Sequence, residues 1–284
     1  MSVKNLIISK IQSSNKPITK SQKLVADFMI KNVEKSTYMT ANQIGTEAGV
    51  SETTVIRFAL SLGYKSFSDL QEDFRERIIT DQTVKRFQQA NKEMGEKDTI
   101  ASSFHLDSEN LNKTYEQINR ESFGKAVDLI CQANKTCVIG FRSSSTDANY
   151  LGFSLHAMLG NVSTITSTGM EFEDCLRNSD EETVIIAISF SRYTAFVVEA
   201  IQYLKKEKNC KVITITDGIH SPLIAFSDEV FIVEVRSFTP INSHVASIAL
   251  CNSFISSIGQ KQTHRIENNL NSLEDYLRKI NIFY

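Results

Sequence analysis

Two short serine-rich segments carry side chains suited to holding an anion. Each follows a short apolar run, which is a candidate strand, and leads into a helical pattern. Ligands of parallel sheets bind beyond the carboxyl ends of the strands, where the free N–H groups and positive dipole end of a helix favour an anion. The candidate ligand-binding residues are Arg142, Ser143, Ser144, Ser145, Ser189, Ser191, Arg192 and Thr194. Two such loops on neighbouring strands predict a cradle for a phosphorylated ligand, whereas a purely structural interpretation makes the serines helix caps.

Residues for acid–base catalysis are not grouped in the sequence. Interconversion of aldoses and ketoses needs a general base, usually Glu or His, within reach of the transferred proton. The sequence contains five dispersed histidines and no H-E-x-x-H motif; the histidines are His105, His156, His220, His244 and His264. We expect surface or packing roles for all of them, and we expect no enzyme activity, no cofactor and no metal site.

The most informative stretch runs from residue 40 to residue 63 and reads TANQIGTEAGVSETTVIRFALSLG. Thr40 and Gln43 have the spacing of a capping box, so a helix should begin at Ala41. Gly49 should end that helix, because glycine adopts a positive φ without steric cost. Ser51 is suited to cap the next helix. The stretch therefore predicts two short helices joined by a tight turn.

The second of these helices has an apolar face and a polar face. The residues expected to pack inward are Val55, Phe58, Ala59 and Leu62. The outward face carries short hydroxyl side chains and one arginine, which suits the major groove of DNA. The candidate DNA-binding residues are Ser51, Thr53, Thr54, Arg57, Lys65 and Ser66. A helical hairpin with a solvated outer face is the alternative interpretation.

Composition and charge restrict the class of protein. A chain of 284 residues, 41% apolar and 23% charged, is long enough for about two globular domains. Residues 1–66 hold nine basic and four acidic side chains, whereas residues 81–284 hold 20 basic and 25 acidic ones, so the N-terminal part is suited to a polyanion. Five cysteines without a C-x-x-C pair argue against disulfides and zinc, and no apolar run approaches the ~20 residues that span a membrane. We expect a cytoplasmic protein.

The pattern of elements divides the chain into three parts. Residues 1–80 show only helical periodicity, residues 81–106 form a polar linker expected to be partly helical, and residues 107–284 alternate apolar runs with helical patterns. Strands are expected at residues 137–141, 162–166, 183–189, 211–216 and 229–235, with helices at 149–159 and 194–206. This alternation predicts right-handed crossovers and a three-layer α/β sandwich around a mainly parallel five-stranded sheet.

The N-terminal segment resembles a known family. From Ala48 to Phe67 it follows, without gaps, the pattern AGVS-x-x-T-V-x-R-F-x-x-x-LG-x-x-x-F, which is similar to the signature of the helix-turn-helix domain of RpiR-type transcriptional regulators. The resemblance implies that the helix from Glu52 to Leu62 is the recognition helix. It also implies that a sugar isomerase (SIS) domain forms the C-terminal half.

Residues from about 107 to 284 resemble a SIS domain, and the family implies that serines and a threonine hold the phosphate of a sugar-phosphate effector. The matching positions are Gly140, Ser144, Ala148, Ser189, Ser191, Thr194, Thr216, Asp217, Ser221, Pro222, Leu223, Ala225 and Asp228. Arg142 and Arg192 stand where the family usually has glycine. Two interpretations of these arginines stay open: a bidentate hydrogen bond to the phosphate, or a side chain that fills the pocket.

We therefore expect a DNA-binding transcriptional regulator of sugar-metabolism genes, with repression as the expected direction, that is controlled by a sugar phosphate. A homodimer or homotetramer would bind a two-fold related operator in double-stranded DNA, and no membrane partner is expected. Three alternatives remain. They are a sugar-phosphate isomerase with an accessory helical domain, a regulator whose pocket is plugged by Arg142 or Arg192, and a helical module that docks proteins.

Overall fold

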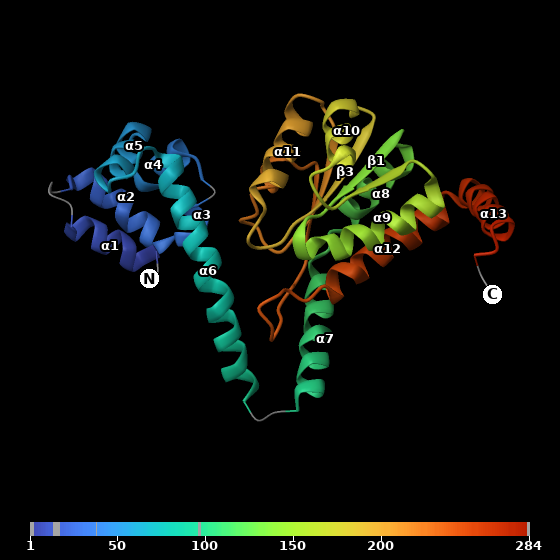
Figure 1. Cartoon of the computed structure of the whole chain (residues 1–284), viewed down its shortest axis with the longest axis horizontal. Coiled ribbons are helices and arrows are strands. Elements are labelled where there is room, and N and C mark those ends of the chain that lie inside the picture. Colours follow the sequence, from blue (N-terminus) through green and yellow to red (C-terminus); the bar gives the residue numbers. More distant parts are fainter. Residues whose placement is uncertain (1–2, 14–17, 38, 96–97, 283–284) are drawn as a thin grey trace. The chain divides into compact units, whose positions relative to one another are not determined.

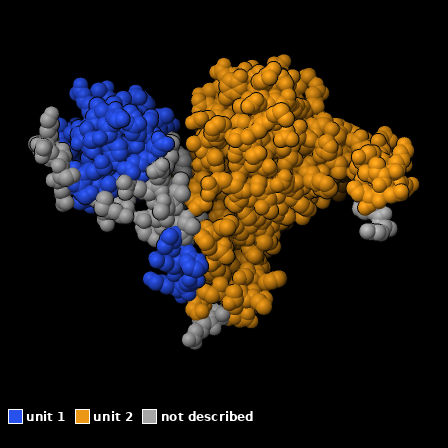
Figure 2. Space-filling view, in the orientation of Figure 1, with its two compact units in different colours: residues 1–93 blue, residues 94–284 orange. Residues whose placement is uncertain are grey.

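The computed structural model describes residues 3–13, 18–37, 39–95 and 98–282 (Figure 1). The chain forms two compact units, Met1–Glu93 and Met94–Tyr284 (Figure 2). The expected linker falls on the last part of one long helix and the first part of the next, while its residues 96–97 lie outside the described chain. The domain limits at residues 80 and 107 stay predictions. In the described part of the chain, no helix is long and apolar enough to cross a membrane.

The first unit is helical, as its periodicity predicts. Its helices are α1 (Val3–Ser13), α2 (Lys20–Lys31), α3 (Val33–Ser36), α4 (Ala41–Ala48), α5 (Glu52–Ser61) and α6 (Phe67–Met94). One apolar stripe from each of several helices meets in a single core, whose fully buried members include Ile7, Val25, Met29, Ile44, Phe58, Leu70 and Phe74. Burying these stripes against each other stabilises α1, α2, α4 and α5, which are too short to persist alone.

The second unit is built on a five-stranded sheet in the order β2-β1-β3-β4-β5. The strands are β1 (Lys135–Ile139), β2 (Val162–Ile165), β3 (Thr183–Ile188), β4 (Lys211–Thr216) and β5 (Glu229–Ile232). All four pairings are parallel, which confirms the predicted sheet. The predicted strand at 229–235 ends early, at Ile232, which pairs with Thr216, the last residue of β4.

Helices cover both faces of this sheet, so the predicted three-layer architecture is confirmed (Figure 1). The helices are α7 (Thr99–Gln117), α8 (Arg120–Gln132), α9 (Ser145–Leu159), α10 (Met170–Asn178), α11 (Ala195–Lys206), α12 (Val245–Lys261) and α13 (Thr263–Lys279). Alternate residues of β3 enter opposite cores: Ile186 packs with α8, α9 and α12, while Ile185 packs with α10 and α11. Burial on both faces favours apolar residues at most positions of a strand, which explains the Val- and Ile-rich runs.

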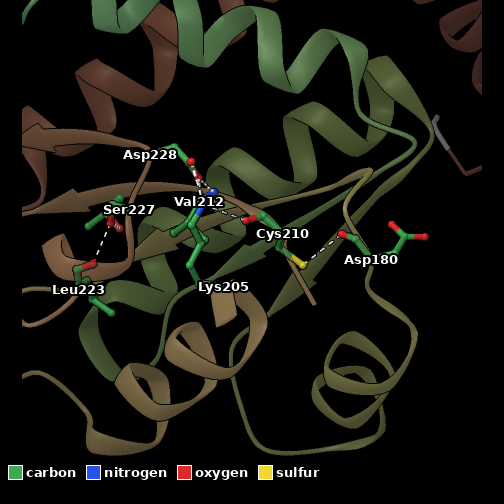
Figure 3. A network of polar contacts seen from close by, with 8 residues as sticks. Asp180, Lys205, Cys210, Val212, Leu223, Ser227 and Asp228 are labelled. Carbon is green, nitrogen blue, oxygen red and sulfur yellow. Dashed lines mark hydrogen bonds and ion pairs between the residues drawn. The ribbon is translucent and has the colours of Figure 1, made fainter. Parts of the chain in front are cut away.

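A polar network fixes the amino end of β4 (Figure 3). The Asp228 carboxylate accepts hydrogen bonds from the Lys205 ammonium at 2.7 Å and from the Val212 backbone N–H at 2.7 Å. Nearby, the Cys210 thiol donates to the Asp180 carbonyl oxygen at 3.3 Å. Because these polar groups form hydrogen bonds with one another, we assign this edge of the sheet a role in stabilising the fold. The two serine-rich segments, residues 142–145 and 189–194, lie at the opposite, carboxyl edge of the sheet.

Candidate functional site

The helix-turn-helix geometry predicted between residues 40 and 63 is present. Thr40 and Gln43 form both hydrogen bonds of the capping box, and α4 begins at Ala41. Gly49 follows the helix with φ 70° and donates its N–H to the last turn. Ser51 caps α5 by accepting a hydrogen bond from the Thr54 N–H at 3.3 Å. Local capping signals therefore determine where both helices begin and end.

Helix α5 presents the polar face that the sequence predicts. The inward set is buried: Val55, Phe58 and Ala59 at 0% exposure and Leu62 at 4%. Thr53, Arg57 and Lys65 are exposed, so their side chains are accessible to a nucleic acid. Ser66 has a second role, because its hydroxyl accepts the Asp69 N–H at 3.0 Å, just before α6. The DNA contacts of all six candidates stay predictions.

Loop 1, residues 140–145, joins β1 to α9 and depends on close backbone approach. A Cβ atom on Gly140 would lie 2.5 Å from the Ser144 carbonyl oxygen and 2.8 Å from the Ala148 Cβ. Ser144 is 4% exposed, and within the described chain its hydroxyl forms no hydrogen bond. The Ser145 hydroxyl instead donates to the Arg142 carbonyl oxygen at 2.6 Å. Ser144 is thus the serine of this loop with a sheltered, unused donor.

Loop 2, residues 189–194, joins β3 to α11 and is tied to Asp217, which follows β4. The Ser191 N–H donates to Asp217 Oδ2 at 2.9 Å, the Ser191 hydroxyl donates to the same oxygen, and the Tyr193 hydroxyl donates to Oδ1 at 2.7 Å. Burial and the Asp217 carboxylate raise the pKa of the Tyr193 phenol. Both donors of Ser191, the backbone N–H and the hydroxyl, therefore bond to Asp217 and hold loop 2 in place. Among the described residues, the hydroxyls of Ser189 and Thr194 have no hydrogen-bond partner.

Both loops contain an arginine in the left-handed region of backbone conformation. Arg142 has φ 58° and Arg192 has φ 72°. Only glycine adopts such angles without cost, and an L-residue there is disfavoured by about 1–2 kcal/mol. Arg142 and the neighbouring Ser143 are exposed, whereas Arg192 is half-buried and interacts with the rest of the chain. The loops thus keep a backbone that suits glycine, although arginine occupies the two positions.

A buried polar cluster beside the loops escaped the sequence analysis. Asp147, in the first turn of α9, is 0% exposed. Its Oδ2 lies 2.6 Å from His244 Nδ1, and its Oδ1 accepts the Ser247 hydroxyl at 2.5 Å. His244 and Ser247 lie about one hundred residues further along the chain, and no local pattern indicates such a contact. The contact of His244 with a buried carboxylate is a feature that the expected surface or packing role did not include.

A separate pocket lies on the other side of β1. It is lined by Lys135, Cys137, Ser163, Met170, Glu171, Asp174 and Cys175. The Lys135 ammonium and the Asp174 carboxylate pair across it at 2.9 Å. None of the predicted effector residues lines this pocket.

Comparison with known proteins agrees with the two units. Residues 5–79 match the helix-turn-helix domain of the rpiR family, and residues 129–257 match the SIS domain. The HTH-type transcriptional regulator HexR of Escherichia coli is 23% identical over 283 residues, which cover 96% of this chain and 94% of HexR. An uncharacterized HTH-type transcriptional regulator of Clostridium perfringens is 26% identical over 230 residues, 78% of this chain and 79% of that protein.

Two solved structures show the same fold. The sugar isomerase domain of an RpiR transcription factor from Sphaerobacter thermophilus superimposes with a TM-score of 0.59 and 28% identity, covering 62% of this chain and 98% of that one. NanR of Vibrio vulnificus, solved in complex with ManNAc-6P, superimposes with a TM-score of 0.67 and 21% identity, covering 97% of this chain and 99% of NanR. With an rpiR-family helix-turn-helix domain followed by a SIS domain, the chain belongs to the RpiR-type transcriptional regulators.

Proposed function

We propose that the protein is a repressor of sugar-metabolism genes whose affinity for its operator is controlled by a sugar phosphate. One observation carries the proposal: the same chain has a capped α5 with an exposed polar face, and a sheet edge where two loops hold unused hydroxyls at the starts of α9 and α11. Helix N-termini and hydroxyl donors are suited to a phosphate. The ligand of NanR, a sugar phosphate, supports the same class of effector here.

The phosphate is assigned to Ser144, Ser189 and Thr194. Their hydroxyls are not used by the described chain, so binding an anion would break no existing hydrogen bond. Ser191 and Asp217 then act as the brace that holds loop 2 in shape. Arg142 and Arg192 are assigned the role in which their guanidinium groups donate hydrogen bonds to the phosphate, rather than the role of filling the pocket.

Regulation needs no bond chemistry, and we propose that the protein is not an enzyme. A ligand changes DNA affinity when it binds the DNA-competent and incompetent states with different free energies. The segment between the two units is where we place this coupling. A protein with this role works in the cytoplasm, where the operator is accessible.

We also propose a homodimer or homotetramer, because a two-fold operator is read by two copies of α5. Helix α7 supports self-association. Its exposed apolar residues are Ile100, Phe104, Leu111 and Tyr115, and their spacing places them on one face of the helix. A Phe104→Glu substitution should lower the molar mass measured by light scattering, whereas Glu116→Gln, at an exposed polar position of the same helix, should leave it unchanged. An unchanged mass for Phe104→Glu would remove α7 from the interface.

The DNA-binding half is tested by salt titration. The genomic fragment bound most tightly is first selected from a library, and its affinity is then measured over a range of salt. Arg57→Ala should weaken binding and reduce the slope of log K against log salt by about 1. Arg177→Ala, an exposed arginine of the second unit, should change neither. Equal results for the two variants would exclude Arg57 from the DNA contact.

The effector half is tested by calorimetry with a panel of hexose 6-phosphates. The double variant Ser144→Ala and Ser191→Ala should abolish binding, because it removes one sheltered donor and the brace of the other loop. Ser253→Ala, an exposed serine of α12, should bind as the wild type does. Conversion of any sugar phosphate during the titration would favour an isomerase, and no heat with the whole panel would refute the effector assignment.

A further inference from the structure

We propose that His244 Nε2 is the acceptor for a hydroxyl group of the effector's sugar, so that this histidine determines which sugar phosphate is bound. The inference rests on the proposed function, since it adds a second contact to the same ligand. It starts from the buried cluster of Asp147, His244 and Ser247, which the phosphate cradle does not use.

The cluster fixes the orientation of the imidazole. The Ser247 hydroxyl donates to Asp147 Oδ1 at 2.5 Å, and His244 Nδ1 lies 2.6 Å from Asp147 Oδ2. In the tautomer that we assign, Nδ1 carries the hydrogen and donates to Asp147, so Nε2 of the neutral ring presents a lone pair.

The lone pair of His244 Nε2 has no partner in the described chain. The atom is buried, and no hydrogen bond satisfies it among the described residues. A buried polar atom left in this state is unfavourable, so such atoms are rare and each one needs a reason. A ligand that donates a hydrogen bond when it binds supplies the reason here.

The position of the ring places this acceptor beside both loops. Asp147 lies three residues after Ser144 of loop 1. Phe190, between Ser189 and Ser191 in loop 2, packs edge-on against the imidazole with the ring centroids 5.7 Å apart. His244 therefore contacts Phe190 of loop 2 and Asp147 of α9, the helix that follows loop 1.

The charge of Asp147 decides which part of the ligand His244 meets. A phosphate carries negative charge and has acceptor oxygens, so it gains nothing from a lone pair and is repelled by a carboxylate one ring away. A sugar hydroxyl is neutral and can donate its hydrogen. Nε2 is thus suited to the sugar, while the hydroxyls of the loops are suited to the phosphate.

Two substitutions of His244 separate the two ring nitrogens. The amide of His244→Asn reaches the place of Nδ1 and can still donate to Asp147, but nothing replaces Nε2. The amide of His244→Gln reaches the place of Nε2. His264→Asn is the matched control, since the His264 side chain is fully exposed on α13.

Calorimetry on the full chain with inorganic phosphate and with the best-binding hexose 6-phosphate gives the readout. His244→Asn should lower the affinity for the sugar phosphate by about ten-fold or more, because one buried hydrogen bond is lost. The affinity for inorganic phosphate should stay unchanged. His244→Gln should lie closer to the wild type, and His264→Asn should match it. Equal weakening of both ligands, or a Gln variant weaker than the Asn variant, would overturn the inference because it would place the effect on the loops or on Asp147.

A measurement on the wild type tests the role of His244 without any variant that could misfold. In a long-range ¹⁵N–¹H correlation spectrum of the histidines, the Nε2 resonance of His244 should shift when the hexose 6-phosphate is added and should stay in place with inorganic phosphate. A signal that does not move at saturation with the sugar phosphate overturns the role of His244 but leaves the proposed function standing. If neither ligand binds the wild type, the proposed function fails together with the inference.

Discussion

Replacing Arg142 or Arg192 tests the backbone conformation that defines both loops. At each position, alanine removes the guanidinium but keeps a Cβ atom at positive φ, whereas glycine removes the Cβ as well. The two variants lose the same side-chain interactions, so the difference between them isolates the backbone. An alanine variant is usually more stable than a glycine variant. Because φ is 58° at Arg142 and 72° at Arg192, we expect the glycine variant to be the more stable one at both positions.

The magnitude follows from two opposing costs. An L-residue in the left-handed region costs about 1–2 kcal/mol, and the greater freedom of unfolded glycine costs about 0.5–1 kcal/mol. The glycine variant should therefore be more stable than the alanine variant by about 0.75 kcal/mol at both arginine positions, the difference between the midpoints of the two costs. Ser143, which is exposed and next to Arg142, is the control. It does not have a positive φ, so Ser143→Ala should be more stable than Ser143→Gly by a similar amount.

Native-state hydrogen exchange of the β3 amides measures this difference in the intact chain. Every residue of β3 is buried, so its slowest amides report the opening of the second unit regardless of the first. A difference of 1 kcal/mol changes such an opening constant about five-fold. At Arg142 and Arg192, an alanine variant as stable as the glycine variant or more stable would contradict the left-handed conformation of the loops. That order of stability is expected only at Ser143.

Three further predictions concern the same elements. Gly140→Ala should destabilise the second unit by about 1–3 kcal/mol, because the new Cβ would meet the Ser144 carbonyl oxygen. The control, Gly124→Ala, lies in α8 with open space around it and should stabilise the second unit by about 0.5–1 kcal/mol. Hydrogen exchange again measures both variants, and equal effects would contradict the packing of loop 1. Asp217→Asn should lower the pKa of Tyr193, because the carboxylate no longer disfavours the phenolate, and the phenolate absorbance at high pH should then appear at lower pH than in the wild type. Ser51→Ala should destabilise the first unit by about 1 kcal/mol through loss of the α5 cap, as measured by exchange of the buried Phe58 amide.

The parts of the fold that depend on short-range signals could be predicted from the sequence. The start of α4 follows from Thr40 and Gln43, three residues apart, and its end follows from Gly49. The strands follow from runs of β-branched residues, because a strand covered on both faces favours compact, mostly apolar side chains at successive positions. Strand ends were predicted less well: β1 begins at Lys135, two residues before the expected start, since pairing with β3 extends it.

The parts that depend on contacts between distant segments could not be predicted. Asp217 and Ser191 lie 26 residues apart, and Asp147 and His244 lie 97 residues apart. Neither pair has a spacing that indicates contact, because the sheet brings them together only after the crossovers have formed. The use of Ser191 as a brace was missed for this reason, and His244 was grouped with histidines that the structure leaves on the surface, such as His264.

Operator affinity in the presence and absence of the sugar phosphate is the most direct test of the central claim. Fluorescence anisotropy with the selected genomic fragment should give a dissociation constant that changes at least about five-fold at saturating hexose 6-phosphate, the lower end of typical allosteric coupling. The Ser144→Ala and Ser191→Ala double variant should bind the fragment equally well but lose this response. An affinity that is the same with and without every bound sugar phosphate would contradict the account.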